Sequence, residues 1–188
     1  MRLSGIVTPD RPLIVVAADE EAAHLQTGLP VLLTGIGKVN AAVAVAAVLA
    51  VHRPSEIINL GTAGALRPGL RGTHEISRVI QHDLDGEAIE ELTGRPTGVP
   101  IDLAAEGPVL ATGDKFVSTT ELRDLLARRA DLADMEGYAV AAAARAAGVG
   151  VRLVKHVSDE ASEGAATTWK DEVDACARDL AAWVATHL

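Results

Sequence analysis

The chain has 188 residues, a length that fits one domain with its own hydrophobic core. Hydrophobic residues make up 48% of the sequence and charged residues 23%, which is too apolar for a disordered chain. The formal net charge of -9 disfavours a broad nucleic-acid-binding surface, but it does not exclude a local anion site.

The only cysteine, Cys176, cannot form a disulfide framework or a zinc knuckle within the chain, so we expect a reducing, cytoplasmic setting. The longest uncharged, mostly apolar run covers residues 39–51 and is shorter than the roughly 20 residues of a membrane-spanning helix. Residues 1–16 make a poor signal peptide. We therefore expect neither membrane insertion nor secretion.

Apolar runs bounded by Gly, Pro, Asn or Asp predict buried strands. In chain order these are residues 13–17, 31–34, 56–60, 77–81, 109–112 and 151–157. Strands that alternate with helices predict an α/β fold, with a mainly parallel or mixed sheet and helices on its faces, in a single domain covering residues 1–188. Ligands of such sheets bind outside the carboxyl ends of the strands.

Helix-like patterns lie between several of these strands. Residues 38–52 are nearly all Ala and Val, which predicts a helix buried on most sides. Residues 119–129 and 137–147 have helical spacing and end signals. The last helix has a stripe that we expect to be core: Trp169, Val173, Cys176, Leu180, Trp183 and Val184. Residues 83–107 are predicted to be irregular or to form small surface excursions.

Two polar clusters follow the first predicted strands. Asp19–Glu21 places three carboxylates after a strand, and either they begin a helix, where acidic residues favour the macrodipole, or they belong to a site. Thr34–Asn40 is a glycine turn that lets the backbone approach a ligand, but it has neither Walker nor dinucleotide-binding spacing.

Two further clusters follow later strands. Asn59–Gly64 reads as a strand followed by small residues in a turn. A late group combines Ala111–Val117, which contains the only phenylalanine, with Asp134–Tyr138 and Lys155–Asp159. Asp159 is either an acid at the sheet edge or, with Ser158, an N-cap of the next helix.

Two other chemistries find little support in the sequence. His82–Asp85 could offer two or three metal ligands, but no fourth partner has a recognisable spacing, so we predict no metal and no cofactor. Ser158 lacks the G-x-S-x-G elbow of serine hydrolases.

Taken in order, these clusters resemble the nucleoside phosphorylase superfamily, and most closely its 5′-methylthioadenosine/S-adenosylhomocysteine nucleosidase branch. The resemblance runs from about Leu13 to the C-terminal helix. It rests on Asp19–Glu21, Gly35–Lys38, Asn59–Gly64, Gly113–Phe116, Asp134–Glu136 and Val157–Asp159. It implies a three-layer fold with a central mixed sheet flanked by helices, and a homodimer.

The resemblance also implies roles for individual residues. Asp159 would be the general acid that protonates the purine N7, with help from Ser158. Glu136 would bind the ribose hydroxyls, and Glu21 would position and deprotonate the attacking water. The remaining members of the expected nucleoside site are Met135 against the sugar, Phe116 and Val117 against the base, Ile36, Thr62, Ala63 and Gly64 around the pocket, and Lys155, which stands where the family usually has an arginine that supports the acid.

The resemblance implies hydrolysis of an adenine-type nucleoside modified at its 5′ position. Phosphorylases of the superfamily have arginines where this chain has Glu21 and Asn59, and a carboxylate in a phosphate site is electrostatically costly. A phosphorylase that uses Lys38 or Arg67, and a non-catalytic nucleoside-binding relative, remain alternatives. The chain is short between Leu66 and Gly107 and after Asp159, which leaves the nucleoside and its 5′ substituent open.

Overall fold

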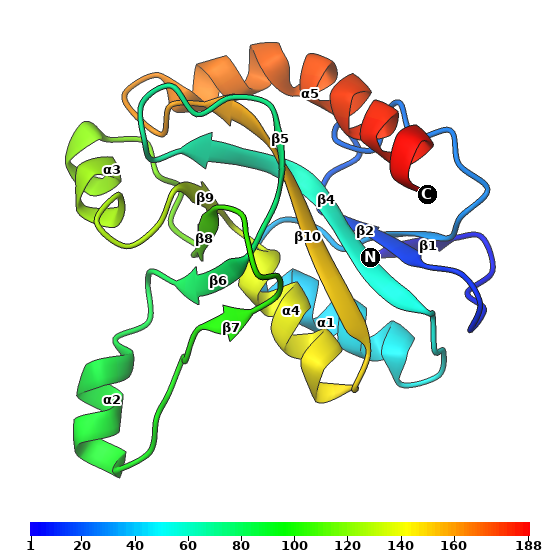
Figure 1. Cartoon of the computed structure of the whole chain (residues 1–188), viewed down its shortest axis with the longest axis horizontal. Coiled ribbons are helices and arrows are strands. Elements are labelled where there is room, and N and C mark those ends of the chain that lie inside the picture. The colour runs from blue at the N-terminus through cyan, green and yellow to red at the C-terminus, as the bar shows by residue number, and fades with distance from the viewer.

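The computed structural model describes all 188 residues. They form one mixed β-sheet with helices on both of its faces (Figure 1). The strands are β1 (Arg2–Ser4), β2 (Leu13–Val16), β3 (Val31–Leu33), β4 (Glu56–Ala65), β5 (Thr73–Glu75), β6 (Arg78–Gln81), β7 (Ile101–Asp102), β8 (Val109–Thr112), β9 (Leu132–Asp134) and β10 (Gly150–Asp159). The helices are α1 (Lys38–Leu49), α2 (Gly86–Thr93), α3 (Thr120–Leu126), α4 (Gly137–Ala146) and α5 (Ala165–His187).

The sheet is built around two long parallel strands, β4 and β10, which pair over most of their length. On the other side of β4 lie β2, which is parallel, and β9, which is antiparallel and pairs only with the end of β4. The remaining strands extend the sheet in the order β1-β3-β2-β4-β9-β8-β6-β7, and β5 pairs with β10. The predicted mixed sheet is confirmed.

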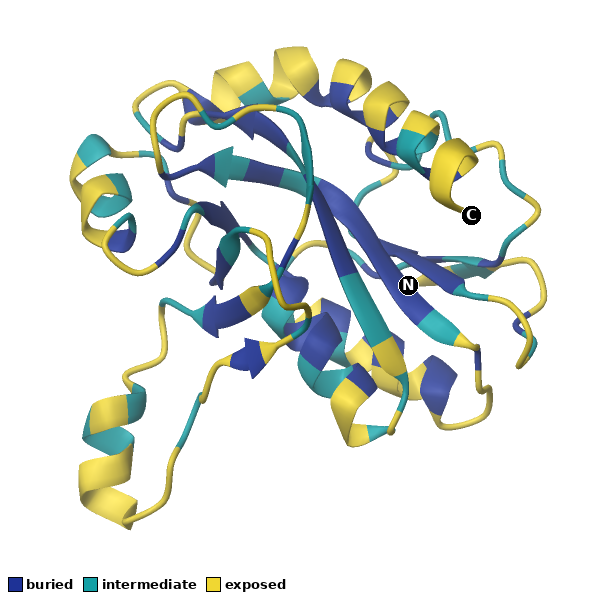
Figure 2. Ribbon diagram, in the orientation of Figure 1, coloured by how far each residue is buried: buried dark blue, intermediate teal, exposed yellow.

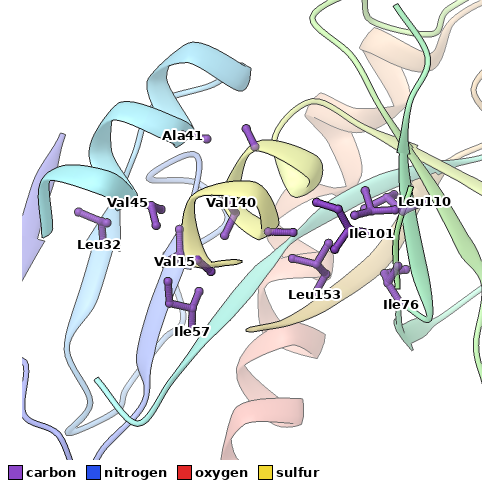
Figure 3. Packing of buried hydrophobic residues seen from close by; sticks show 14 of the residues in the cluster. Val15, Leu32, Ala41, Val45, Ile57, Ile76, Ile101, Leu110, Val140 and Leu153 are labelled. Carbon is purple, nitrogen blue, oxygen red and sulfur yellow. The ribbon is translucent and has the colours of Figure 1, made fainter. Parts of the chain in front are cut away.

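Consecutive residues of the central strands point into two different cores. Val15, Ile57 and Leu153 belong to a cluster with Val45 of α1 and Val140 of α4 (Figure 3). The next residue on each of these strands packs in the cluster of α5, namely Val16, Ile58 and Val154 together with Leu180 and Val184. Because both faces are covered, these strands read as continuous apolar runs.

The helices form the outer layers. Figure 1 shows α5 across one face of the sheet and α1 with α4 on the opposite face. The inner side of α5 is buried and its outer side is exposed (Figure 2), as the predicted stripe requires. None of the helices combines the length and the apolar character needed to cross a lipid bilayer.

The structure corrects three of the predicted elements. β4 does not stop at Leu60 but continues through Gly61–Gly64 to Ala65, so these small residues lie within a strand and form no turn. Asp19–His24 forms turns and begins no helix. α1 is buried on one face only, because Val39 and Val43 on its outer face are 71% and 63% exposed.

The segment that was predicted to be irregular contains a short strand, β7, and a projecting helix, α2 (Figure 1). Asp85 caps α2 by accepting a hydrogen bond from the backbone N–H of Ala88 (3.0 Å). No residue of α2 is buried. Residues 84–98, which we call the arm, therefore extend away from the rest of the protein.

Candidate active site

A cavity of about 250 Å³ lies where the carboxyl ends of several strands meet. It is lined by Ala17, Ala18, Glu21, Ile36, Thr62, Ala63, Gly64, Lys115, Phe116, Val117, Ala133, Asp134, Met135, Glu136, Ser158, Asp159, Ala161, Ala166 and Trp169. Every site residue expected from the sequence is among them except Lys155. Buried carboxylates that meet in one cavity are the arrangement that acid–base chemistry requires.

Asp159 is the last residue of β10, and a β-bulge determines how it is presented. The register with β4 shifts between Val157 and Asp159, which makes Ser158 the extra residue. As a result Ser158 and its neighbour Asp159 both line the cavity, although consecutive strand residues normally face opposite sides.

The carboxyl group of Asp159 is fixed at both oxygens. Its Oδ2 accepts a hydrogen bond from Ser158 Oγ (2.8 Å), and its Oδ1 accepts one from the backbone N–H of Ala161 (2.8 Å). The alternative in which Ser158 or Asp159 caps the next helix is wrong, because α5 begins only at Ala165. A Cβ on Gly64 would lie 3.0 Å from Asp159 Oδ1, so a larger residue there would crowd this carboxyl group.

Glu21 is buried on the turn that follows β2. Its Oε1 accepts hydrogen bonds from the backbone N–H of Thr62 (2.7 Å) and from Thr62 Oγ1 (2.8 Å). Its Oε2 receives only a long hydrogen bond, 3.3 Å, from the N–H of Ala18. Oε1 of Glu21 therefore accepts two short hydrogen bonds, whereas Oε2 has lone pairs that can accept further ones.

Glu136 stands between β9 and α4 and faces the N-terminus of α1. Its Oε1 accepts a 2.7 Å hydrogen bond from the N–H of Gly37, the residue that precedes α1. Burial, reinforced by the nearby Asp134, raises the pKa of Glu136 to about 8, although Lys155 and the Gly37 N–H act in the opposite direction. This carboxyl group can therefore hold a proton near neutral pH.

Lys155 lies beneath the cavity instead of lining it. Its side chain is 1% exposed, and Nζ forms an ion pair of 2.9 Å with Asp134 Oδ2. Burial lowers the pKa of Lys155, but the carboxylates of Asp134, Glu136 and Glu21 outweigh this effect and raise the pKa above its ordinary value. Lys155 stands where the family usually has an arginine that supports the acid, and its ion-pair partner in this structure is Asp134.

The cavity also has an apolar wall. Phe116, in the loop after β8, is 39% exposed, and it lines the cavity together with Ile36, Val117 and Met135. A large aromatic ring left partly exposed at a cavity is unusual in a chain with 2% aromatic residues. It provides a flat surface against which a planar ring can stack.

Sequence reasoning missed three polar or aromatic residues that line the cavity: Lys115, Asp134 and Trp169. Lys115 and Asp134 belong to the polar clusters described above, but the sequence indicates no role for either of them. Trp169 was assigned to the core stripe of α5, and its spacing could not reveal that its indole N–H reaches Thr62 Oγ1 (2.9 Å).

The other candidate side chains have structural partners. Asp83 binds Lys38 Nζ (2.5 Å) and the N–H of Asp114 (2.8 Å), and Arg67 pairs with Asp131 (2.7 Å). No three His, Cys, Asp or Glu side chains are grouped closely enough to hold a metal ion. Asn59 is buried and donates to the carbonyl of Val15 (3.0 Å), away from the cavity lining.

A mixed sheet between helical layers, with a carboxylate-rich cavity at its strand ends, defines an α/β protein that binds a small molecule. A family model described as the phosphorylase superfamily matches residues 24–106 and 74–187. The chain belongs to this superfamily, and the family expected from the sequence is confirmed.

Individual relatives agree with this assignment. A 5′-methylthioadenosine/S-adenosylhomocysteine nucleosidase of Geobacillus thermodenitrificans is 27% identical over 95% of this chain and 87% of its own length. The enzyme of the same name from Oceanobacillus iheyensis is 34% identical, but the alignment spans only 52% of each chain.

A solved structure extends the likeness to three dimensions. The MTA/SAH nucleosidase of Streptococcus pneumoniae, determined in complex with 8-aminoadenine, has a TM-score of 0.76 and 25% identity, with 93% of this chain and 96% of that one covered. The fold is therefore that of the nucleoside phosphorylases, as expected.

Proposed function

We propose that this protein is a nucleosidase, an N-ribosyl hydrolase that cleaves the N-glycosidic bond of an adenine-type nucleoside with a modified 5′ position, such as methylthioadenosine or adenosylhomocysteine. The observation that carries the proposal is the convergence of Glu21, Glu136 and Asp159 on one cavity beside Phe116. Relatives named as nucleosidases of these two compounds support the substrate class.

In this proposal each carboxyl group has one task. Asp159 donates a proton to N7 of the base, which makes the base a better leaving group as the bond between C1′ and N9 breaks. Glu136 binds the ribose hydroxyls with Met135 against the sugar. Glu21 accepts a proton from the water that adds to the cationic C1′, so that free base and a ribose derivative are released.

The charges around the cavity favour water over phosphate as the nucleophile. Four acidic side chains line it, and Lys115 is the only lysine or arginine among the lining residues. Lys38 and Arg67, the cations that a phosphorylase could have used, are held by Asp83 and Asp131. A phosphate dianion beside Glu21 would meet like charge in a poorly solvated site.

The test is to incubate the purified protein with methylthioadenosine, adenosylhomocysteine, adenosine, inosine and futalosine in phosphate-free buffer and to measure free base by chromatography. We expect release from at least one adenine nucleoside, and about 10²- to 10⁴-fold slower release by the Asp159→Asn variant. Strict dependence on phosphate or arsenate would establish phosphorolysis instead. Tight binding by calorimetry without turnover would establish the non-catalytic alternative.

We further propose that the protein is a cytoplasmic homodimer that associates through α1. The outer face of this helix presents an apolar stripe to solvent, formed by Val39, Val43, Ala46, Ala47 and Ala50. The buried thiol of Cys176, the only cysteine, fits a reducing compartment.

Light scattering over a range of protein concentrations tests this association. We expect a dimer for the native chain and a monomer for Val43→Glu, because a charge in the stripe opposes its burial. Leu92→Glu, at an 85% exposed position of α2, is the matched control and should remain dimeric. A native chain that is monomeric throughout overturns the proposal.

A further inference from the structure

Trp169 lies one turn into α5 and belongs to the cavity wall as well as to the helix. Its indole Nε1 donates a 2.9 Å hydrogen bond to Thr62 Oγ1, which lies on β4, 107 residues earlier in the chain. This bond is a direct polar link between the helical layer and the sheet at the cavity.

The direction of the hydrogen bonds is fixed by the chemistry of the three groups. An indole N–H can only donate, whereas a threonine hydroxyl has one hydrogen to give and lone pairs to accept. Because Thr62 Oγ1 accepts from Trp169, its own hydrogen is free to be given to Glu21 Oε1, 2.8 Å away. Trp169, Thr62 and Glu21 thus form a relay with a single orientation.

The relay determines which oxygen of Glu21 is available. Oε1 takes two short hydrogen bonds, both from Thr62, while Oε2 has only the 3.3 Å contact to the Ala18 N–H. On the Oε1 side the packing is close, because a Cβ on Gly61 would lie 3.2 Å from Glu21 Oε1 and 3.1 Å from Lys155 Nζ. The carboxylate cannot rotate without breaking these contacts.

We propose that Trp169 is a positioning residue, which acts through Thr62 to hold the Glu21 carboxylate so that Oε2 is presented to the attacking water. The inference rests on the proposed nucleosidase function. It assigns the indole N–H a role distinct from that of the ring, since the ring forms cavity wall whether or not the N–H is present.

Kinetics separate these two roles. Trp169→Phe keeps an aromatic wall and removes the N–H, so we expect kcat to fall about 5- to 10-fold while KM changes less than about 2-fold. Thr62→Val should lower kcat further, and the Trp169→Phe/Thr62→Val double variant should lose no more than Thr62→Val alone, because both act on one path. Thr62→Ser, which keeps the hydroxyl, should restore most of the activity.

A readout independent of turnover uses the two tryptophans of the chain. In the protein labelled with ¹⁵N at the indole, Trp183→Phe removes one of two cross-peaks and so assigns that of Trp169. We expect Thr62→Val to shift the Trp169 peak and to speed exchange of its indole hydrogen at least 10-fold. Thr62→Ser should leave both nearly unchanged.

The outcomes are distinguishable. If the native enzyme is active but Trp169→Phe keeps full kcat, raises only KM, or combines multiplicatively with Thr62→Val, the relay is overturned and the proposed function stands. An indole hydrogen that is indifferent to Thr62→Val overturns the relay by itself. If no nucleoside is cleaved although the indole contact is observed, the proposed function fails, and the role in water activation fails with it.

Discussion

The cavity and the arm differ in how their residues are packed against the rest of the protein. The cavity takes its residues from strand ends and turns that are anchored in the sheet, and Glu21, Glu136, Ser158 and Asp159 are all buried. The arm contributes no residue to the cavity lining, and its helix buries none of its side chains. The residues that we propose for the chemistry are thus confined to the part of the molecule that is packed around the sheet.

The strongest way to test this contrast is to remove the acid from the cavity. We expect Asp159→Asn to lower kcat by about 10²- to 10⁴-fold, the usual contribution of a positioned general acid, while adenine binding measured by calorimetry stays within a few fold. Asp179→Asn, on the outer layer, serves as the control and should keep native kcat. An active Asp159→Asn protein would remove Asp159 from the mechanism.

A smaller effect is expected from crowding the same carboxyl group. The added methyl of Gly64→Ala would lie 3.0 Å from both Asp159 Oδ1 and the Cβ of Ala161. We expect a loss of about 1–3 kcal/mol in the free energy of unfolding, together with a fall in kcat. Gly150→Ala, at the start of β10, is the control, because its Cβ would meet only Glu56 Cβ at 3.8 Å and its φ is not positive, so it adds a methyl without crowding.

The protonation of Glu136 makes the stability of the protein depend on pH. Its pKa is raised by burial and by Asp134 to about 8, from an ordinary value of 4.5. The contribution of protonated Glu136 to the stability of the folded state is therefore complete below about pH 4.5. It is lost as pH rises toward 8, because the folded state must then hold a buried charge.

Glu136→Gln should remove this loss. We expect the free energy of unfolding of the variant to rise relative to that of the native protein as pH rises from about 5 to 9. The difference should reach about 1–4 kcal/mol at pH 9, measured by denaturant unfolding. The same variant should bind nucleoside more weakly, because the amide replaces the carboxyl group that we propose binds the ribose hydroxyls. A stability difference that is constant with pH would contradict the assignment, and the exposed Glu20→Gln is the control.

The smallest effect is expected in the arm. Asp85→Ala removes the N-cap of α2 and should fray that helix, at a local cost of about 1 kcal/mol. Because α2 packs against nothing that forms the cavity, we expect the melting temperature of the protein to stay within about 2 °C and kcat within 2-fold. A large loss of kcat would show that the arm takes part in a working site.

The same contrast explains what could be predicted from the sequence. Val109–Thr112 was predicted with the bounds that the structure has, since a short apolar run between turn residues has few alternatives. β4 was cut short because Gly61 and Gly64 read as turn signals. The structure explains these glycines differently: Glu21, Lys155, Asp159 and Ala161 pack against the strand where a side chain would otherwise stand.

Other features left no local signal. The three residues of β9 are too few to show a period, and α2 has its own cap but buries no side chain. The site residues could be named because their clusters match a family, but their contacts depend on long-range pairing, as for Thr62 with Trp169. Spacing along a helix distinguishes an inner from an outer face, and it does not distinguish core from cavity wall.

The bulge at Ser158 has a consequence for how this site can change over time. In a regular strand only one of two neighbouring residues faces the cavity, so the extra residue is what lets Ser158 and Asp159 both reach it. Deletion of Ser158 would restore regular pairing and leave the acid on the cavity side, but it would remove the hydroxyl that holds Asp159 Oδ2. Residues 84–98 have no such constraint. Evolution of this fold can therefore lengthen or shorten the arm freely, while at the end of β10 it is limited to replacement at constant length.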